Sequence, residues 1–249
     1  MMRRHIRKNR LRVYEVRNII DTLADAGSVL ELRRDFGLAM ITSLIRIEGR
    51  SVGVIANNPN YISGAIDSDA SDKAARFMQL CDAFDIPILS LCDTPGIMVG
   101  PEVEKTALVR HAARMFVVGS NITVPLLFVV LRKAYGLGAI AMAAGSYRSA
   151  ALNVSWPTGE FGGMGLEGMV KLGFRAELES IADSADRKER YQELVDRAYQ
   201  RGKAIQQAVG FGVDNTIDPA DTRRLLSQTL SGISKPGPRT GRKRLIDIW

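Results

Sequence analysis

The sequence is poor in the residues that usually form metal sites and catalytic dyads. It has two cysteines, Cys81 and Cys92, and two histidines, His5 and His111, among 249 residues. Neither cysteine is in a Cys-x-x-Cys motif or beside a histidine, so we expect no metal site. Both cysteines stand in apolar segments, which predicts buried free thiols in a reducing compartment. His5 lies in a basic segment and His111 in the middle of a predicted helix, which favours a structural role for His111.

Long apolar runs are also lacking. No run reaches the roughly 18 residues that a membrane-spanning helix needs, so we expect no membrane contact. The first residues, "MMRRHIRKNRLRVYEV", have charge but no apolar core, which excludes a secretory signal. The same segment has no serine, which argues against a mitochondrial transit peptide. We therefore expect a cytoplasmic protein.

The net charge of +7 is concentrated at the two ends of the chain. Residues 1–12 carry six basic side chains and residues 235–244 carry five, in both cases without an acid. Removing these eleven leaves 23 basic residues against 27 acidic ones, so the remainder is mildly acidic. We expect a basic arm (1–12), one domain (13–232) and a basic tail (233–249). Neither residues 1–12 nor residues 235–244 contain an aromatic residue for base stacking, so we expect no nucleic acid partner.

Hydrophobic periodicity predicts an α/β fold. Apolar runs that read as buried strands alternate with amphipathic helical patterns. We expect a hairpin from 38–49 and 51–59, and further strands at 87–92, 124–132 and 151–156. Helices are expected at 16–23, 69–84, 102–118, 164–173, 175–208 and 216–230, and residues 133–146 are expected to form a glycine-rich turn that leads into an alanine-rich helix.

The segment "LSLCDTPGIMVGPEVE" (89–104) raises the question of a nucleotide switch, because Asp-x-x-Gly follows a strand in many GTPases. A GTPase would also need a G-x-x-x-x-G-K-[ST] loop and an N-K-x-D motif, and both are missing. The "YGLGAIAMAAG" segment has its third glycine in the wrong place for a dinucleotide fingerprint. No G-x-S-x-G motif supports a serine nucleophile.

Three glycine-rich segments lie where a strand is followed by a helix: "DTPGIMVG", "AYGLGA" and "WPTGEFGGMGLEG". Glycine lets a ligand approach the backbone, and the start of a helix supplies unpaired N–H groups. Two such groups aimed at one point form an oxyanion hole, which stabilises an enolate without a side-chain acid. The glycines could also simply close tight turns.

The same segments resemble a known family. "GAIDSDASDKAARFMQLCDAFDIPILSLCDTPGIMVG", "VPLLFVVLRKAYGLGA" and "WPTGEFGGMGLEG" are similar to the C-terminal half of the carboxyltransferase of biotin-dependent acyl-CoA carboxylases, of the propionyl-CoA and acetyl-CoA carboxylase β-subunit type. "DPADTRRLL" resembles the final helix of that family, and the match runs from about residue 13 to 231. The resemblance implies a crotonase/ClpP-like fold of repeated ββα units, with helices covering stacked sheets.

The resemblance also implies a chemistry and its residues. In the family, carboxybiotin on a carrier protein releases CO2, and the enolate of an acyl-CoA thioester attacks it. Backbone amides stabilise both oxyanions, and the pair in this half maps onto Leu137 and Gly138. These follow Tyr135 and Gly136, where the family often has Gly-Gly-Ala and this chain has Gly-Leu-Gly. Ile140 corresponds to a residue of the acyl and biotin pocket.

Neighbouring walls of that pocket are expected at Gly96, Ile97, Met164 and Gly165, with Asp93 capping the turn before them. The expected partners are an N-terminal carboxyltransferase half, a biotin carboxyl carrier, a biotin carboxylase and acyl-CoA, in a homo-oligomer or a hetero-complex. We expect the chain alone to be inactive, because this half supplies only one amide pair.

Two alternatives remain open from the sequence. One is a crotonase-like acyl-CoA hydratase or decarboxylase acting alone, for which Glu160 and Glu167 are the candidate bases. The other is a non-catalytic partner subunit. The sequence does not identify the acyl-CoA.

Overall fold

The computed structural model describes residues 2–6 and 12–233. They form one eight-stranded sheet with the order β1-β2-β3-β4-β5-β6-β8, while β7 pairs with β5 outside this path. β1, β2 and β3 pair antiparallel, and all later pairs are parallel. The strands are β1 (Leu30–Leu32), β2 (Met40–Ile47), β3 (Arg50–Asn57), β4 (Ile88–Thr94), β5 (Leu126–Tyr135), β6 (Leu152–Ser155), β7 (Glu160–Gly162) and β8 (Asn215–Thr216).

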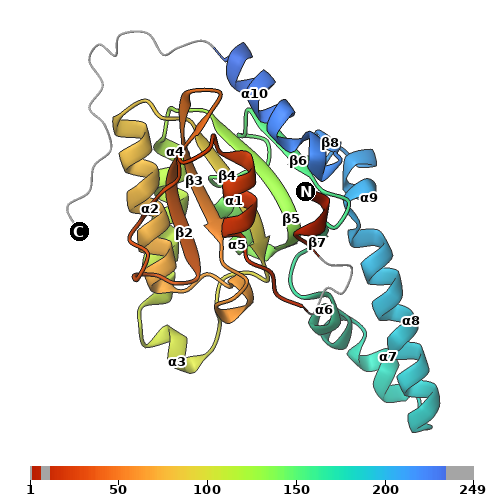
Figure 1. The fold of residues 1–249 in the computed structure, drawn as a ribbon. Coiled ribbons are helices and arrows are strands. Elements are labelled where there is room, and N and C mark those ends of the chain that lie inside the picture. Colours follow the sequence, from red (N-terminus) through yellow and green to blue (C-terminus); the bar gives the residue numbers. More distant parts are fainter. Residues whose placement is uncertain (1, 7–11, 234–249) are drawn as a thin grey trace.

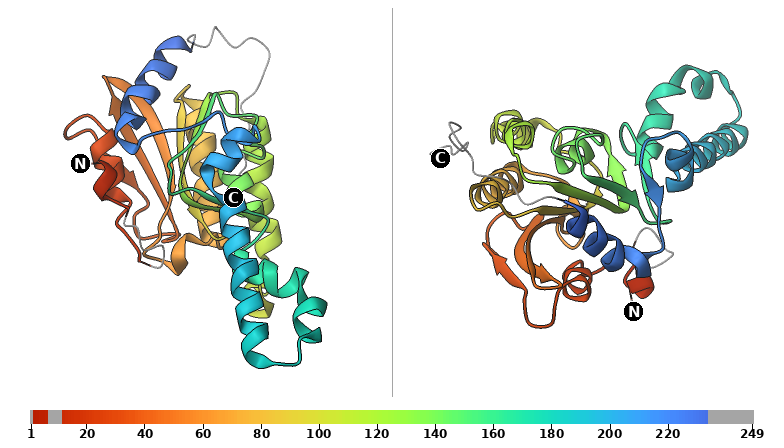
Figure 2. Two further views of the ribbon diagram at one scale, coloured as in Figure 1. Left: turned by 90° about the vertical axis from the view of Figure 1, so that its right-hand side faces the viewer. Right: turned by 90° about the horizontal axis from the view of Figure 1, so that it is seen from above.

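Helices cover both faces of this sheet (Figure 2). One face carries α2 (Ser68–Ala83), α4 (Leu108–Asn121) and α5 (Gly136–Met142); the other carries α1 (Arg17–Leu23) and α10 (Thr222–Gly232). Alternate residues of β5 enter the two cores: Phe128 and Val130 pack on the α2 side, and Leu127 and Val129 pack on the α1 side. This period of two, with apolar residues on both faces, explains why the central strands are continuously hydrophobic.

A second group of helices projects away from the sheet (Figure 1). It consists of α6 (Leu166–Gly173), α7 (Arg175–Ser180) and α8 (Ser184–Gly202), followed by α9 (Ala204–Val209). A small separate core, which includes Leu166, Val170 and Leu194, joins α6 to α8. The rest of α8 is exposed and charged, as the sequence predicted for 175–208. The remaining short helices are α3 (Pro101–Glu104), η1 (Met2–Arg4), η2 (Ile62–Gly64) and η3 (Pro219–Asp221).

Most predicted elements are confirmed, and three expectations need correction. The single helix expected at 102–118 is two helices, because the Thr106 hydroxyl donates to the Val103 carbonyl (2.7 Å) and Ala107 is left-handed at φ 55°. The strand expected to end at 132 continues to Tyr135, since 133–135 pair with β7, and α5 begins directly after it at Gly136. The resemblance implied stacked sheets, whereas all strands of the described residues belong to one hydrogen-bonded sheet.

The described part of the basic arm packs on the domain. Met2 and Ile6 are buried in the core beside α1, and the Arg3 guanidinium forms an ion pair with Asp218. Most of the expected basic tail, residues 234–249, lies outside the described residues. Within residues 2–6 and 12–233, no helix is long and apolar enough to cross a membrane. The same residues contain no cluster of His, Cys, Asp and Glu that could hold a metal ion.

Candidate functional site

The first glycine-rich turn follows β4, which is buried along its whole length. The Gly96 amide donates to the Thr94 hydroxyl oxygen (3.1 Å), and that hydroxyl donates to the Gly96 carbonyl (3.1 Å). Gly96 has φ 129°, which favours glycine. Thr94 therefore closes this turn, and the expectation that Asp93 caps it is wrong. The Asp93 carboxylate points to β5 instead, where it pairs with Arg132 and Lys133.

The second turn joins β5 to α5. Gly136 is the first residue of α5 and is left-handed at φ 56°. The amides of the first helical turn, which include those of Leu137 and Gly138, have no carbonyl partner within the helix. Gly138 is buried against the first turn: a Cβ added to it would lie 2.7 Å from the Cα and carbonyl carbon of Gly96.

The third turn joins β7 to α6 and lies against the second. A Cβ added to Gly136 would lie 2.8 Å from the Gly163 carbonyl oxygen. The structure thus brings all three glycine-rich turns together, with their backbones too close for side chains at Gly136 and Gly138. Convergence of this kind is what a backbone binding site requires, and isolated tight turns would not need it.

A cavity of about 560 Å³ opens beside the three turns. This volume falls in the range of about 300–1,000 Å³ typical of small-molecule sites. One wall is formed by the three turns and the other by one face of α4. Among the residues that the structure describes, Glu104 is the only ionisable one that lines it. The lining residues are Pro95, Gly96, Ile97, Met98, Val99, Glu104, Leu108, Val109, Ala112, Ala113, Phe116, Gly136, Leu137, Gly163, Met164 and Gly165.

Most of the residues expected at the site line this cavity: Gly96, Ile97, Gly136, Leu137, Met164 and Gly165. The other three lie behind or beside it. Gly138 packs behind it against Gly96, and the buried Tyr135 donates its hydroxyl to Glu160 (3.0 Å). Ile140 is half-buried one turn further along α5.

The sequence reasoning missed the α4 wall and Glu104. Leu108, Val109, Ala112, Ala113 and Phe116 follow helical spacing and form one face, so periodicity could have identified it. The two carboxylates that were considered as bases do not line the cavity. Glu160 accepts from Tyr135, and Glu167 accepts from the Tyr199 hydroxyl (2.6 Å).

His111 lies on α4 and faces α2. Its Nδ1 is 2.7 Å from Asp72 Oδ2, and the other oxygen of Asp72 accepts from Arg114 (2.7 Å). These contacts join α4 to α2 and fit the structural role expected for His111. Cys81 and Cys92 are free and buried, as predicted. Burial raises the pKa of the Cys81 thiol to about 12 and that of the Cys92 thiol also well above its usual range, so neither is a nucleophile at neutral pH.

Comparison with known proteins decides the family. Residues 4–238 match the model of the carboxyl transferase domain. The chain belongs to the carboxyl transferase family. It is 39% identical over 221 residues to the methylmalonyl-CoA carboxyltransferase 12S subunit of Propionibacterium freudenreichii, a match that covers 87% of this chain and 41% of that protein. It is 38% identical over 214 residues to the propionyl-CoA carboxylase carboxyltransferase subunit of Haloferax mediterranei, a match that covers 86% of this chain and 41% of that protein.

Solved structures agree with this placement. A single-chain, multi-domain long-chain acyl-CoA carboxylase superposes with a TM-score of 0.83 at 49% identity, over 92% of this chain and 22% of that chain. The transcarboxylase 12S structure superposes with a TM-score of 0.85 at 34% identity, over 97% of this chain and 47% of that chain. The carboxyl transferase chain described here therefore has the crotonase-like fold that the resemblance implied. It spans about two fifths of the length of the curated relatives it matches.

Proposed function

We propose that this chain is the C-terminal part of the carboxyltransferase of a biotin-dependent acyl-CoA carboxylase. In this role it transfers a carboxyl group from biotin to the α-carbon of an acyl-CoA. The observation that carries the proposal is the convergence of the three glycine-rich turns on one apolar cavity. Removal of a proton next to a thioester creates an enolate oxyanion, and preorganised backbone amides stabilise such a charge well in a dry site.

The proposed oxyanion donors are the amides of Leu137 and Gly138. Among the residues that the structure describes, no hydrogen bond joins either amide to another group. The Gly96 turn packs directly against Gly138 and fixes the start of α5. The family resemblance assigns this amide pair to the chemistry, and the geometry supports it because both neighbouring turns hold the α5 start in place.

The character of the cavity lining supports biotin as the proposed occupant. The biotin ring system is largely apolar with one polar ureido edge, which matches apolar walls beside a pair of free amides. When bound on its carrier protein, biotin would bring the carboxyl group to be transferred. The residues proposed to hold it are Gly96, Ile97, Met164 and Gly165, with Tyr135 and Ile140 as supports of the same pocket. CoA thioesters are the proposed second substrate, and methylmalonyl-CoA, propionyl-CoA and long-chain acyl-CoA appear in the names of relatives.

The cavity rim supports a site shared with a second protein unit. Val99, Val109 and Leu137 stand at the rim with exposed fractions of 82%, 69% and 62%. Apolar side chains gathered this way are typical of a surface that another unit covers. We propose an N-terminal carboxyltransferase half as that unit, with biotin carboxyl carrier and biotin carboxylase as further partners. One relative is described as a hexamer, which favours an oligomer here too. The buried free thiols favour the cytoplasm.

The positions of Glu160 and Glu167 argue against the alternative of a hydratase or decarboxylase acting alone. Each accepts a hydrogen bond from a tyrosine hydroxyl and lies outside the cavity lining, so neither is placed as a base beside the glycine turns.

The proposal is tested by decarboxylation of malonyl-CoA or methylmalonyl-CoA with free biotin. The purified chain is assayed alone and together with an N-terminal half from a relative. We expect activity only in the mixture, and loss of that activity when avidin sequesters the biotin. An inactive mixture would contradict the catalytic role and leave the non-catalytic subunit as the better explanation. Full activity of the chain alone would contradict the shared site.

A further inference from the structure

The pairing of β4 with β5 contains an irregularity just before the candidate site. Cys92 lies opposite Val130, but Thr94 lies opposite Ala134. One residue of β4, Asp93, therefore faces three residues of β5: Leu131, Arg132 and Lys133. Bulges of this kind bend a strand and re-aim the side chains and turns beyond them.

The bulge is also the point at which β5 changes its partner. Before it, Leu127 to Val130 pair with β6; after it, Lys133 to Tyr135 pair with β7. Two of the three glycine-rich turns begin at this second pairing, since β5 leads into α5 and β7 leads into α6. The position of Leu137 and Gly138 relative to Gly96 therefore depends on how the bulge is held.

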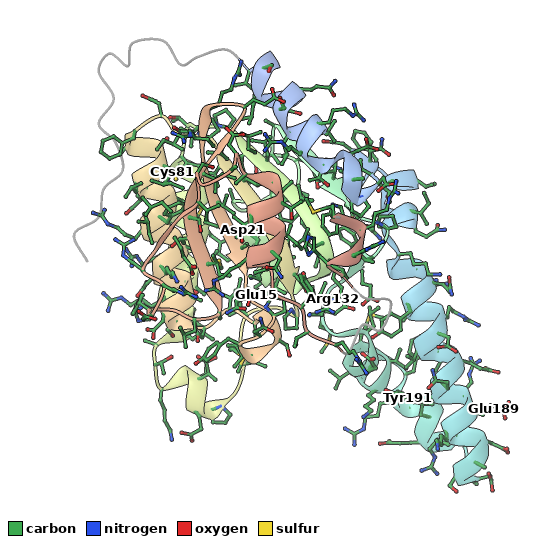
Figure 3. All side chains as sticks on the ribbon, in the orientation of Figure 1. Glu15, Asp21, Cys81, Arg132, Glu189 and Tyr191 are labelled. Atoms are coloured by element: carbon green, nitrogen blue, oxygen red, sulfur yellow. The ribbon has the colours of Figure 1, made fainter. Side chains whose placement is uncertain are left out.

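The Asp93 carboxylate contacts both charged residues of the bulge. One oxygen accepts from the Lys133 amide (3.1 Å) and pairs with Lys133 Nζ (2.8 Å). The other accepts from Arg132 Nε (3.1 Å) and pairs with Arg132 Nη2 (3.1 Å). The Asp93 side chain is only 1% exposed and that of Arg132 only 4%. Figure 3 labels Arg132 near the end of the sheet that faces α6.

The N-terminal segment covers this cluster from the outside. Arg132 Nη1 donates to the Arg12 carbonyl (2.8 Å), and its guanidinium carbon lies 4.9 Å from the centre of the Tyr14 ring. Burial, reinforced by the charge of Asp93, raises the pKa of the Tyr14 hydroxyl well above its usual value. Tyr14 therefore stays neutral and adds no charge that could compete with Asp93 for the two cations.

We infer that Asp93 is a positioning residue, which holds the β5 bulge so that the start of α5, with the amides of Leu137 and Gly138, packs against the Gly96 turn. Asp93 lies outside the cavity lining and acts through Arg132 and Lys133. Removing a buried carboxylate that faces two cations has a large effect, because the buried Arg132 guanidinium would lose the negative charge that balances its own. The effect on decarboxylation rests on the proposed function, whereas the effect on hydrogen exchange in the bulge does not.

The test compares Asp93→Asn with Asp25→Asn in the full chain. Asp25 is a matched control, because its carboxylate also accepts from an arginine, Arg223 (2.7 Å), and from two backbone amides, those of Glu48 (3.0 Å) and Gly49 (2.8 Å). It lies outside the cavity lining. Each variant is assayed for decarboxylation with an N-terminal half, and hydrogen exchange is followed in a peptide covering 131–136.

We expect Asp93→Asn to lower kcat about 10- to 100-fold, since a displacement of about 1 Å in a site can reduce rates by that amount. The KM for acyl-CoA should stay within about twofold, because the inference concerns the amide pair and not the binding of CoA. Exchange at 131–136 should rise in Asp93→Asn and not in Asp25→Asn. A full restoration of kcat by Asp93→Glu, with its longer side chain, would contradict a role that depends on this geometry.

Unchanged kcat with unchanged exchange in Asp93→Asn would overturn the inference. If that variant does not fold, Lys133→Met is used, because it keeps Asp93, Arg132 and the Lys133 amide bond. A kcat lowered severalfold with faster exchange then supports the inference, and a variant like the wild type overturns it. If the wild-type mixture shows no activity, the proposed function fails, and the exchange comparison alone decides whether Asp93 holds the bulge.

Discussion

Gly136 offers the sharpest test of whether close packing of the turns determines the rate. In Gly136→Ala, the new Cβ would stand 2.8 Å from the Gly163 carbonyl oxygen, whereas ordinary contacts begin at 3.4 Å. The spacing between the start of α5 and the Gly163 turn must therefore widen by about 0.6 Å, which changes where the amides of Leu137 and Gly138 lie relative to the third turn. The left-handed φ of 56° adds about 1–2 kcal/mol of backbone strain for alanine.

A matched variant separates these two effects. Gly27 is left-handed at φ 68°, but a Cβ there meets no atom within 4 Å. Gly27→Ala should therefore lose about 1–2 kcal/mol in the free energy of unfolding and keep its kcat. Gly136→Ala should show at least the same loss of stability and, in addition, a kcat lowered about tenfold or more.

The assay is decarboxylation with an N-terminal half, at a temperature where circular dichroism shows both variants folded. Equal kcat values for the two variants would refute the claim that the spacing of the turns controls the rate. The closeness of Gly136 to Gly163 would then be a matter of packing alone.

Three further predictions follow. Ile140→Asp should lower the ratio of kcat/KM for propionyl-CoA to that for acetyl-CoA about tenfold, and an unchanged ratio would remove Ile140 from the acyl pocket. Burial lowers the pKa of Lys73 from 10.5 to about 8, so the unfolded chain binds more protons between these values. The unfolding free energy of wild type relative to Lys73→Met should therefore rise from about pH 8 towards 10.5, and a flat difference would contradict this. Iodoacetamide at neutral pH should leave Cys81 and Cys92 unmodified in the folded chain, which mass spectrometry can check.

Much of the fold could be predicted because its signals are local. The continuous apolar runs of β4 and β5 and the helical spacing of α2 each determine an element within a short window. The break between α3 and α4 could not be predicted in this way, since it depends on the Thr106 hydroxyl bonding to Val103 and to Ser68 across the fold.

The candidate site was predicted in part for the same reason. Glycines at strand ends indicate backbone exposure, and the three segments that carry them do converge. The role predicted for Asp93 was wrong because its true partners are set by the register shift between β4 and β5. One of these partners, the Lys133 amide, lies 40 residues further along the chain. Sequence spacing around "DTPG" contains no information about that shift.

The departure from the Gly-Gly-Ala of the resemblance at Leu137 and Gly138 has a physical explanation in the structure. Gly136 is retained, where both its φ of 56° and the nearby Gly163 carbonyl require glycine. At position 138, an alanine Cβ would lie 2.7 Å from the Cα of Gly96, so glycine lets the two turns approach more closely in this chain. At position 137 the added leucine is 62% exposed and lines the cavity, where it places an apolar side chain at the rim. Glycine at position 138 therefore narrows the gap between the turns, and leucine at position 137 narrows the cavity beside them. Neither removes a backbone amide, so both remain compatible with chemistry that depends on the backbone alone.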